Sequence, residues 1–116
     1  MKLYGIPNCN TVKKARTWLD EHGISYEFHD FKKSGISKET LQQWLGQVDW
    51  EKLVNRAGMT WRGLSDAEKV AVTDAASAIT LMQDKTSVIK RPVLVKDDQI
   101  LHLGFTEAAY AKLFNA

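Results

Sequence analysis

The strand-to-helix turn at residues 7–11 constrains the fold of this chain more than any other segment. An apolar run typical of a buried strand, Leu3–Ile6, precedes the turn. After the turn, apolar residues recur at helical spacing: Val12, Ala15, Trp18 and Leu19. The only cysteine, Cys9, is therefore expected at or just before the N-terminus of a helix.

This position favours ionisation of the Cys9 thiol. Unpaired N–H groups and the positive end of the helix dipole stabilise an anion there, and the thiolate is the reactive form of cysteine. Lys13, Lys14 and Arg16 follow in the first turns, where basic residues support a thiolate and attract an anionic substrate. Each of these features also has an alternative interpretation on these residues alone. A lone cysteine can be a small buried apolar residue, and a run of basic residues can be a solvated face of the helix.

The composition is ordinary for a soluble globular protein. The 116 residues fit one domain, and a net charge of +2 is too small to argue for direct binding of nucleic acid or an anionic membrane. No apolar run has membrane-spanning length, and the N-terminus lacks the apolar core of a signal peptide. One cysteine forms no internal disulfide, so we expect a cytoplasmic protein with glutathione and other thiols as partners. One cysteine and three scattered histidines predict no metal site and no bound cofactor.

The first 36 residues predict a βαβ unit. Gly23 stands where a helix is expected to end. The alternation of Ile24–Phe31 predicts a second strand, parallel to the first, and residues 32–36 predict a basic loop.

Residues 37–90 carry helical patterns and little strand signal. Helix starts are predicted at Ser37, Asp49, Ser65 and Asp74, with a capping box joining Ser65 to Glu68. We expect several short helices that form an insertion, not a second domain.

The C-terminal residues 91–116 predict a hairpin and a helix. Pro92–Val95 and residues 99–103 are typical of antiparallel strands joined by a turn at 96–98. Gly104 breaks the second strand, and Thr106 caps a helix whose expected apolar residues are Ala109, Leu113 and Phe114. The order β-α-β, helical insertion, β-β-α predicts an α/β thioredoxin-like fold in one domain, with a core of residues 1–36 and 91–116 and an insertion at 37–90.

Three segments resemble the ArsC/Spx family, and most of all its small YffB-type members. They are the turn Pro7-Asn8-Cys9-Asn10-Thr11, Arg56 in the helical middle, and Arg91-Pro92-Val93-Leu94-Val95. The resemblance spans the whole chain. It implies a nucleophilic Cys9, a cis peptide bond before Pro92, and an Arg91 backbone that lies against the thiol substrate.

Two departures from this family separate its activities. The arsenate reductases of the family hold their oxyanion with three arginines, and the third is missing here, where the chain reads Leu103-Gly104-Phe105. Arsenate reduction is therefore a weak alternative. The Spx-type redox switches carry a second cysteine where this chain has Val12, so their sensor is absent. Binding of RNA polymerase as a Spx-like regulator remains an alternative.

A single thiol predicts an enzyme that needs an external thiol to complete its cycle. Cys9 can attack a disulfide substrate, but the resulting mixed disulfide must be resolved by a second thiol, for which glutathione is the natural candidate. We therefore expect a glutathione-dependent thiol-disulfide oxidoreductase with Cys9 as its nucleophile. The substrate-binding residues predicted with it are Asn10, Thr11, Lys13, Arg56, Arg91 and Pro92. Outside the family frame, Thr11 is as readily a helix cap, and Arg56 and Lys13 are solvated surface residues.

Overall fold

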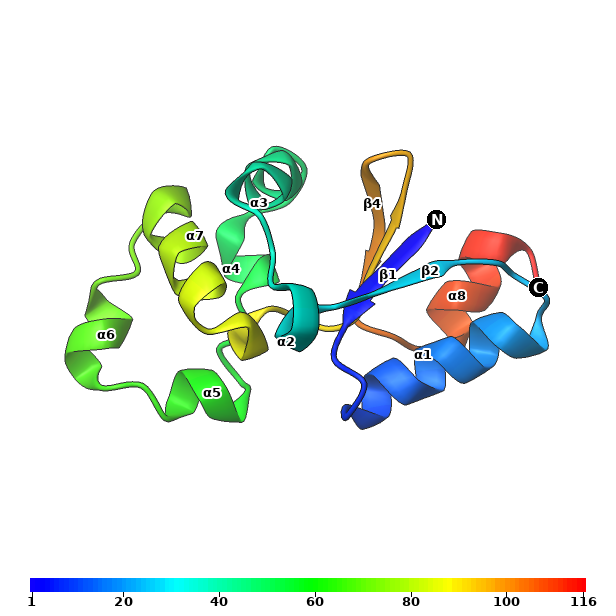
Figure 1. Ribbon diagram of the computed structural model, residues 1–116, viewed down its shortest axis with the longest axis horizontal. Coiled ribbons are helices and arrows are strands. Elements are labelled where there is room, and N and C mark those ends of the chain that lie inside the picture. The colour runs from blue at the N-terminus through cyan, green and yellow to red at the C-terminus, as the bar shows by residue number, and fades with distance from the viewer. The chain divides into compact units, whose positions relative to one another are not determined.

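The computed structural model describes residues 1–116 and divides the chain into two compact units. The first unit comprises residues 1–34 and 91–116, and the second comprises residues 35–90. Figure 1 follows the chain from the blue N-terminal strand through the green and yellow helices of the second unit to the red C-terminal helix. The first junction lies two residues before the boundary expected from the sequence.

A four-stranded sheet forms the framework of the first unit. Its strands are β1 (Lys2–Gly5), β2 (Glu27–Asp30), β3 (Val93–Lys96) and β4 (Gln99–Leu103), in the spatial order β2-β1-β3-β4. β1 is parallel to β2, and β3 is antiparallel to both β1 and β4. The βαβ and ββα halves thus form the thioredoxin-like α/β fold that the sequence predicted.

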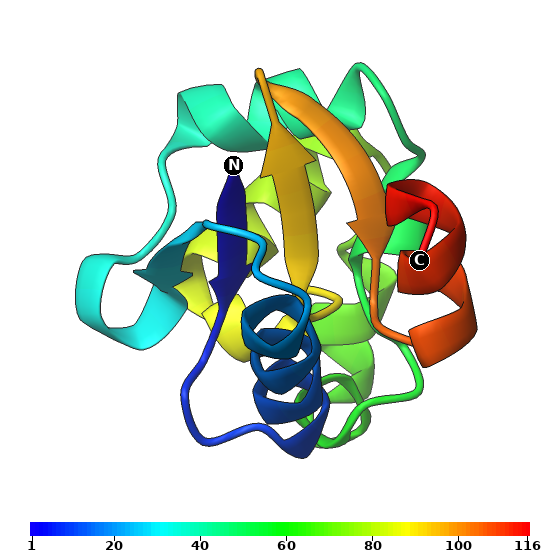
Figure 2. The same cartoon turned by 90° about the vertical axis from the view of Figure 1, so that its right-hand side faces the viewer.

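Helices α1 (Asn10–Glu21) and α8 (Glu107–Phe114) pack on the sheet through one shared core (Figure 2). That core combines Leu3 and Leu94 of the strands with Ala15, Trp18, Leu19 and Tyr110 of the helices. The predicted buried face of α1 is confirmed. Gly23 follows the end of this helix and has a positive φ of 66°. The predicted face of α8 is correct only in part. Phe114 packs against this core, but the fully buried residue is Tyr110, and Leu113 is 38% exposed.

The second strand is shorter than the alternation of residues 24–31 predicted. β2 ends at Asp30, and Phe31–Ser34 form a helical turn, α2, where the end of a strand and a basic loop were expected. The cause is local, because Asp30 Oδ1 accepts hydrogen bonds from the N–H groups of Lys32 at 2.9 Å and Lys33 at 3.4 Å. At the same end of the sheet, β3 begins at Val93, and the Arg91–Pro92 bond is cis, as the family resemblance implied.

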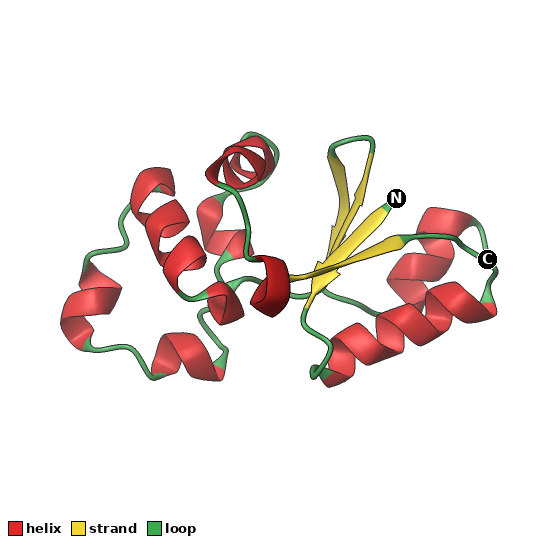
Figure 3. Ribbon diagram, viewed as in Figure 1, coloured by secondary structure: helices red, strands yellow, loops and turns green.

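The second unit consists of short helices joined by loops, as Figure 3 shows. They are α3 (Lys38–Leu45), α4 (Trp50–Leu53), α5 (Met59–Arg62), α6 (Asp66–Val70), α7 (Ala75–Asp84) and a 3₁₀ turn at Thr86–Val88. The side chains of Ser37, Ser65 and Asp74 make the predicted capping hydrogen bonds, whereas Asp49 occupies the N-cap of α4 without one. A bridge between Val54 and Ile89 closes this unit near its junctions. None of the helices in the chain is both long and apolar enough to cross a membrane.

Candidate thiol site

Cys9 occupies the N-cap of α1, as the turn sequence predicted. Its backbone is extended, with φ −128° and ψ 125°, and its carbonyl accepts the first helical hydrogen bond, from the N–H of Lys13 at 2.9 Å. Gly5 allows the first turn of the helix to approach the end of β1, because a Cβ at Gly5 would lie 2.8 Å from Cγ2 of Val12. This close packing fixes the turn that carries the thiol, and no motif in the sequence pointed to it.

The surroundings of Cys9 lower the pKa of its thiol. Partial burial acts in the opposite direction and is the largest single influence, since it disfavours the charged form. The N–H of Val12, the guanidinium of Arg91 and the N–H of Thr11 together outweigh it by stabilising the thiolate. A thiol that is partly exposed and ionises readily can act as a nucleophile.

Arg91 reaches the thiol from the turn that leads into β3. It directly precedes the cis proline, and the carbonyl of Pro92 accepts a hydrogen bond from the N–H of Gly104 at 2.9 Å. This bond ties the proline turn to the end of β4, so the backbone next to Arg91 is held between two segments of the sheet. The structure thus brings Cys9 together with Arg91, which is 82 residues away in sequence and directly precedes Pro92.

The other residues predicted on α1 line its exposed first turn. Asn10, Thr11 and Lys13 all have exposed side chains, and Thr11 acts on the thiolate through its backbone N–H. Lys13 also lines a groove of about 530 Å³ between α1 and the start of α8, which the sequence did not reveal.

Arg56 belongs to the second unit and is described within it. Its Nη2 lies 3.0 Å from Oε2 of Glu51, and its guanidinium carbon is 5.8 Å from the centre of the Trp50 ring. Both partners are near in sequence, and the Arg56 side chain is half exposed. Its role as an anion ligand stays a prediction.

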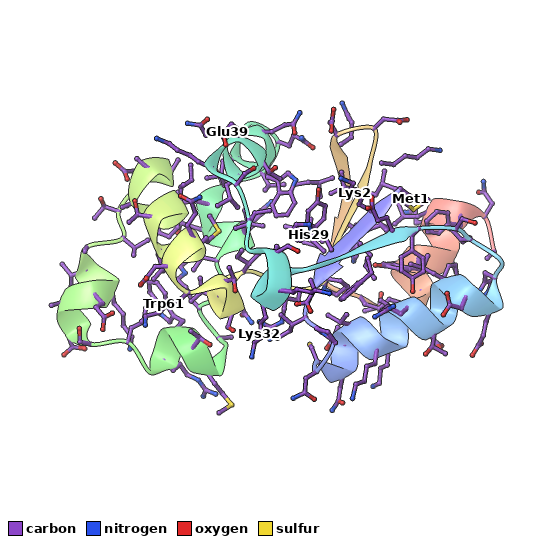
Figure 4. All side chains as sticks on the ribbon, viewed as in Figure 1. Met1, Lys2, His29, Lys32, Glu39 and Trp61 are labelled. Atoms are coloured by element: carbon purple, nitrogen blue, oxygen red, sulfur yellow. The ribbon has the colours of Figure 1, made fainter.

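The three histidines pack against aromatic rings. His22 stacks on Trp18 with ring centres 3.8 Å apart, and His29, labelled in Figure 4, lies 4.7 Å from the ring of Tyr4. His102 meets Tyr110 edge-on at 6.0 Å, and burial lowers its pKa. These contacts give each histidine a packing role, and no group of three His, Cys, Asp or Glu side chains could hold a metal ion.

Comparison with known proteins places this site in a family context. The family model described as "ArsC family" matches residues 4–113. A solved structure titled YffB protein is 49% identical, with a TM-score of 0.89 over 97% of this chain and 96% of that one. An arsenate reductase (ArsC) related protein from Brucella melitensis is also 49% identical, with a TM-score of 0.78 over 99% and 94% of the two chains. The global transcriptional regulator Spx of Streptococcus agalactiae is 27% identical over 90% of this chain and 76% of its own length.

Proposed function

The chain belongs to the ArsC family, and we propose that within it this protein is a glutathione-dependent thiol-disulfide oxidoreductase. The observation that carries the proposal is the lowered pKa of the Cys9 thiol, which has the Arg91 guanidinium and the N–H groups of a helix start beside it. A single thiol in this setting suits attack on a disulfide and lacks an internal partner to resolve the product.

The reaction runs in two exchanges. The Cys9 thiolate attacks the glutathione sulfur of a mixed disulfide R–S–S–G, a Cys9–S–S–G bond forms, and R–S⁻ leaves and takes a proton from water. The thiolate of a second glutathione then attacks the glutathione sulfur on Cys9, which yields oxidised glutathione and returns the Cys9 thiolate. Overall, R–S–S–G and one glutathione thiol become R–SH and one glutathione disulfide, so the electron pair comes from glutathione.

Each predicted side chain has a distinct task in this scheme. Arg91 stabilises the Cys9 thiolate as attacking and leaving group, and the N–H groups of Val12 and Thr11 do the same. Pro92 shapes the edge against which the substrate disulfide lies. Lys13 and Arg56 attract the carboxylates of glutathione.

Intact-mass spectrometry after exposure to oxidised glutathione tests this function. We expect one glutathione to add at Cys9, with a rate whose half-maximum lies at a pH below the ordinary thiol pKa. Addition of reduced glutathione should then restore the original mass. Modification only at or above the ordinary thiol pKa would remove the basis for the enzyme, and Cys9→Ser, which leaves no thiol, is the control.

The similarity to Spx supports a second candidate function, binding of RNA polymerase. Such a role predicts an interaction that survives Cys9→Ser, because the second cysteine of the Spx switch is replaced by Val12 here. Pull-down of purified polymerase by wild type and by Cys9→Ser distinguishes this function from thiol chemistry.

Arsenate reduction is a third and weaker candidate. We expect no arsenate-dependent oxidation of glutathione, because Leu103-Gly104-Phe105 lacks the third arginine.

A further inference from the structure

We propose that the groove between α1 and the start of α8 binds an extended segment of a protein substrate, with the substrate disulfide at Cys9 and a basic substrate residue at Glu21. This inference rests on the proposed function and adds its substrate class, which is glutathionylated proteins.

Both walls of the groove begin close to the turn that carries the thiol, although Cys9 itself does not line the groove. One wall consists of Lys13, Thr17 and Glu21, which are neighbours at intervals of four residues on α1, and Lys13 is one turn after Cys9. The opposite wall is Phe105–Glu107, directly after Gly104. Gly104 donates its hydrogen bond to the carbonyl of Pro92, next to the arginine that contacts the Cys9 sulfur.

The far end of the groove, at Glu21, lies beyond the reach of a glutathione joined to Cys9. From position 9 to position 21, a helix advances about 18 Å at 1.5 Å per residue. Three extended residues span at most about 11 Å, whereas about five or six residues span the whole stripe. Glutathione bound at Cys9 therefore leaves the far end of the groove empty, whereas an extended segment of a protein chain is long enough to reach it.

The chemistry of the groove specifies that segment. Trp18 and the partly buried Phe105 give the groove its apolar surface. Lys13 and Lys14 lie toward its Cys9 end, Glu21 lies at its far end, and Glu107 adds a second acid on the opposite wall. This order of charges opposes the dipole of α1, whose first turn holds no acid and whose last turn holds no base, so helix stability does not explain it. The groove therefore suits a segment with an acidic residue beside its cysteine, an apolar residue in the middle and a basic residue about five positions from the cysteine.

Two glutathionylated heptapeptides test the inference. Both carry the glutathionylated cysteine first, glutamate second and phenylalanine fourth, and they differ only in lysine or glutamate at position six. We expect wild type to prefer the lysine peptide in kcat/KM by about two- to fivefold, as for an exposed charge pair. Glu21→Lys should abolish or invert the ratio, whereas Asp20→Lys should keep it. Asp20 is the matched control, since it is an exposed acid on the same helix that does not line the groove.

A binding measurement separates failure of the groove from failure of the proposed function. Fluorescence anisotropy with Cys9→Ser and peptides that carry serine for cysteine should show the same preference without any thiol chemistry. Preferential binding without turnover of either peptide would overturn the oxidoreductase and leave the groove intact. Equal ratios for wild type, Glu21→Lys and Asp20→Lys in both assays would overturn the groove alone.

Discussion

Two kinds of group control the Cys9 thiol at the scale of single residues. The N–H groups of Val12 and Thr11 belong to the backbone, so no side-chain replacement removes them. The guanidinium of Arg91 can be removed, and it acts both as a hydrogen-bond donor and as a positive charge. Arg91 is therefore the residue through which the reactivity of the thiol can be changed by mutation.

Arg91→Ala should raise the pKa of the Cys9 thiol. Without the guanidinium, fewer hydrogen-bond donors stabilise the thiolate, and the unfavourable effect of burial on the charged form weighs more. The pH at which alkylation by iodoacetamide reaches half its maximal rate should therefore increase. Arg91→Lys keeps the charge and should fall between wild type and Arg91→Ala. Arg62→Ala removes an exposed arginine of the second unit and serves as the control. An unchanged midpoint in Arg91→Ala would contradict the contact.

Tyr110→Phe should stabilise the protein. The Tyr110 hydroxyl is fully buried and has no hydrogen-bond partner, and burial raises its pKa far above the ordinary value. Because an unsatisfied buried hydroxyl costs about 1 kcal/mol or more, we expect the free energy of unfolding in urea to rise by about 1 kcal/mol. Tyr26→Phe should give no gain, since the Tyr26 hydroxyl accepts a hydrogen bond from Arg16 Nε at 3.1 Å. A loss of stability in Tyr110→Phe would contradict the interpretation that the buried hydroxyl destabilises the protein.

These residues show what local sequence could and could not predict. Cys9 was predictable because strand and helix periodicities meet at one turn, and Arg91 because a family motif marks it. Tyr110 was not predicted in the core because tyrosine carries a polar hydroxyl. Its ring nevertheless packs edge-on against the rings of Trp18 and Phe105, with ring centres 5.6 Å and 4.7 Å apart. The closeness of Gly5 and Val12 was missed because nothing in the alternation of a strand specifies the distance to a helix.

At the scale of elements, predictions held where the signal and its partner are adjacent in sequence. A capping side chain bonds an N–H group three residues away, so Ser37, Ser65 and Asp74 could be assigned without the fold. The early end of β2 was also local, but the alternation of residues 24–31 hid the turn that Asp30 stabilises. The bridge between Val54 and Ile89 joins residues 35 positions apart, and no local pattern predicts such a pairing.

Ser37→Ala should destabilise the second unit by about 1 kcal/mol, the usual result of losing an N-cap. The Ser37 side chain accepts a hydrogen bond from the N–H of Thr40 at 3.1 Å, and that donor would lose its partner. Asp49→Ala is the matched comparison in the same unit, because Asp49 holds an N-cap position without a capping hydrogen bond and should cost clearly less. Urea denaturation followed by circular dichroism measures both. Equal losses would mean that the hydrogen bond adds nothing at these caps.

At the scale of the whole molecule, the residues predicted for the site fall in both compact units. Cys9, Arg91, Pro92 and the groove belong to the first, and Arg56 belongs to the second. The first unit joins the two ends of the chain, residues 1–34 and 91–116, and the change from strand to helix patterns falls near both junctions. The contribution of Arg56 to catalysis is the part of the proposed site that a mutation must decide.

Arg56→Ala should weaken turnover without altering the thiol. If its guanidinium binds a carboxylate of glutathione, its loss removes a charge-assisted hydrogen bond, and kcat/KM for a glutathionylated substrate should fall about tenfold, mainly through KM. The pH midpoint for alkylation of Cys9 should stay at the wild-type value, because the donors that lower the pKa of this thiol all belong to the first unit. Arg62→Ala controls for the loss of an exposed charge in the same unit. If Arg56→Ala had the same kcat/KM as Arg62→Ala, Arg56 would not take part in the site. Its role would then be the ion pair with Glu51.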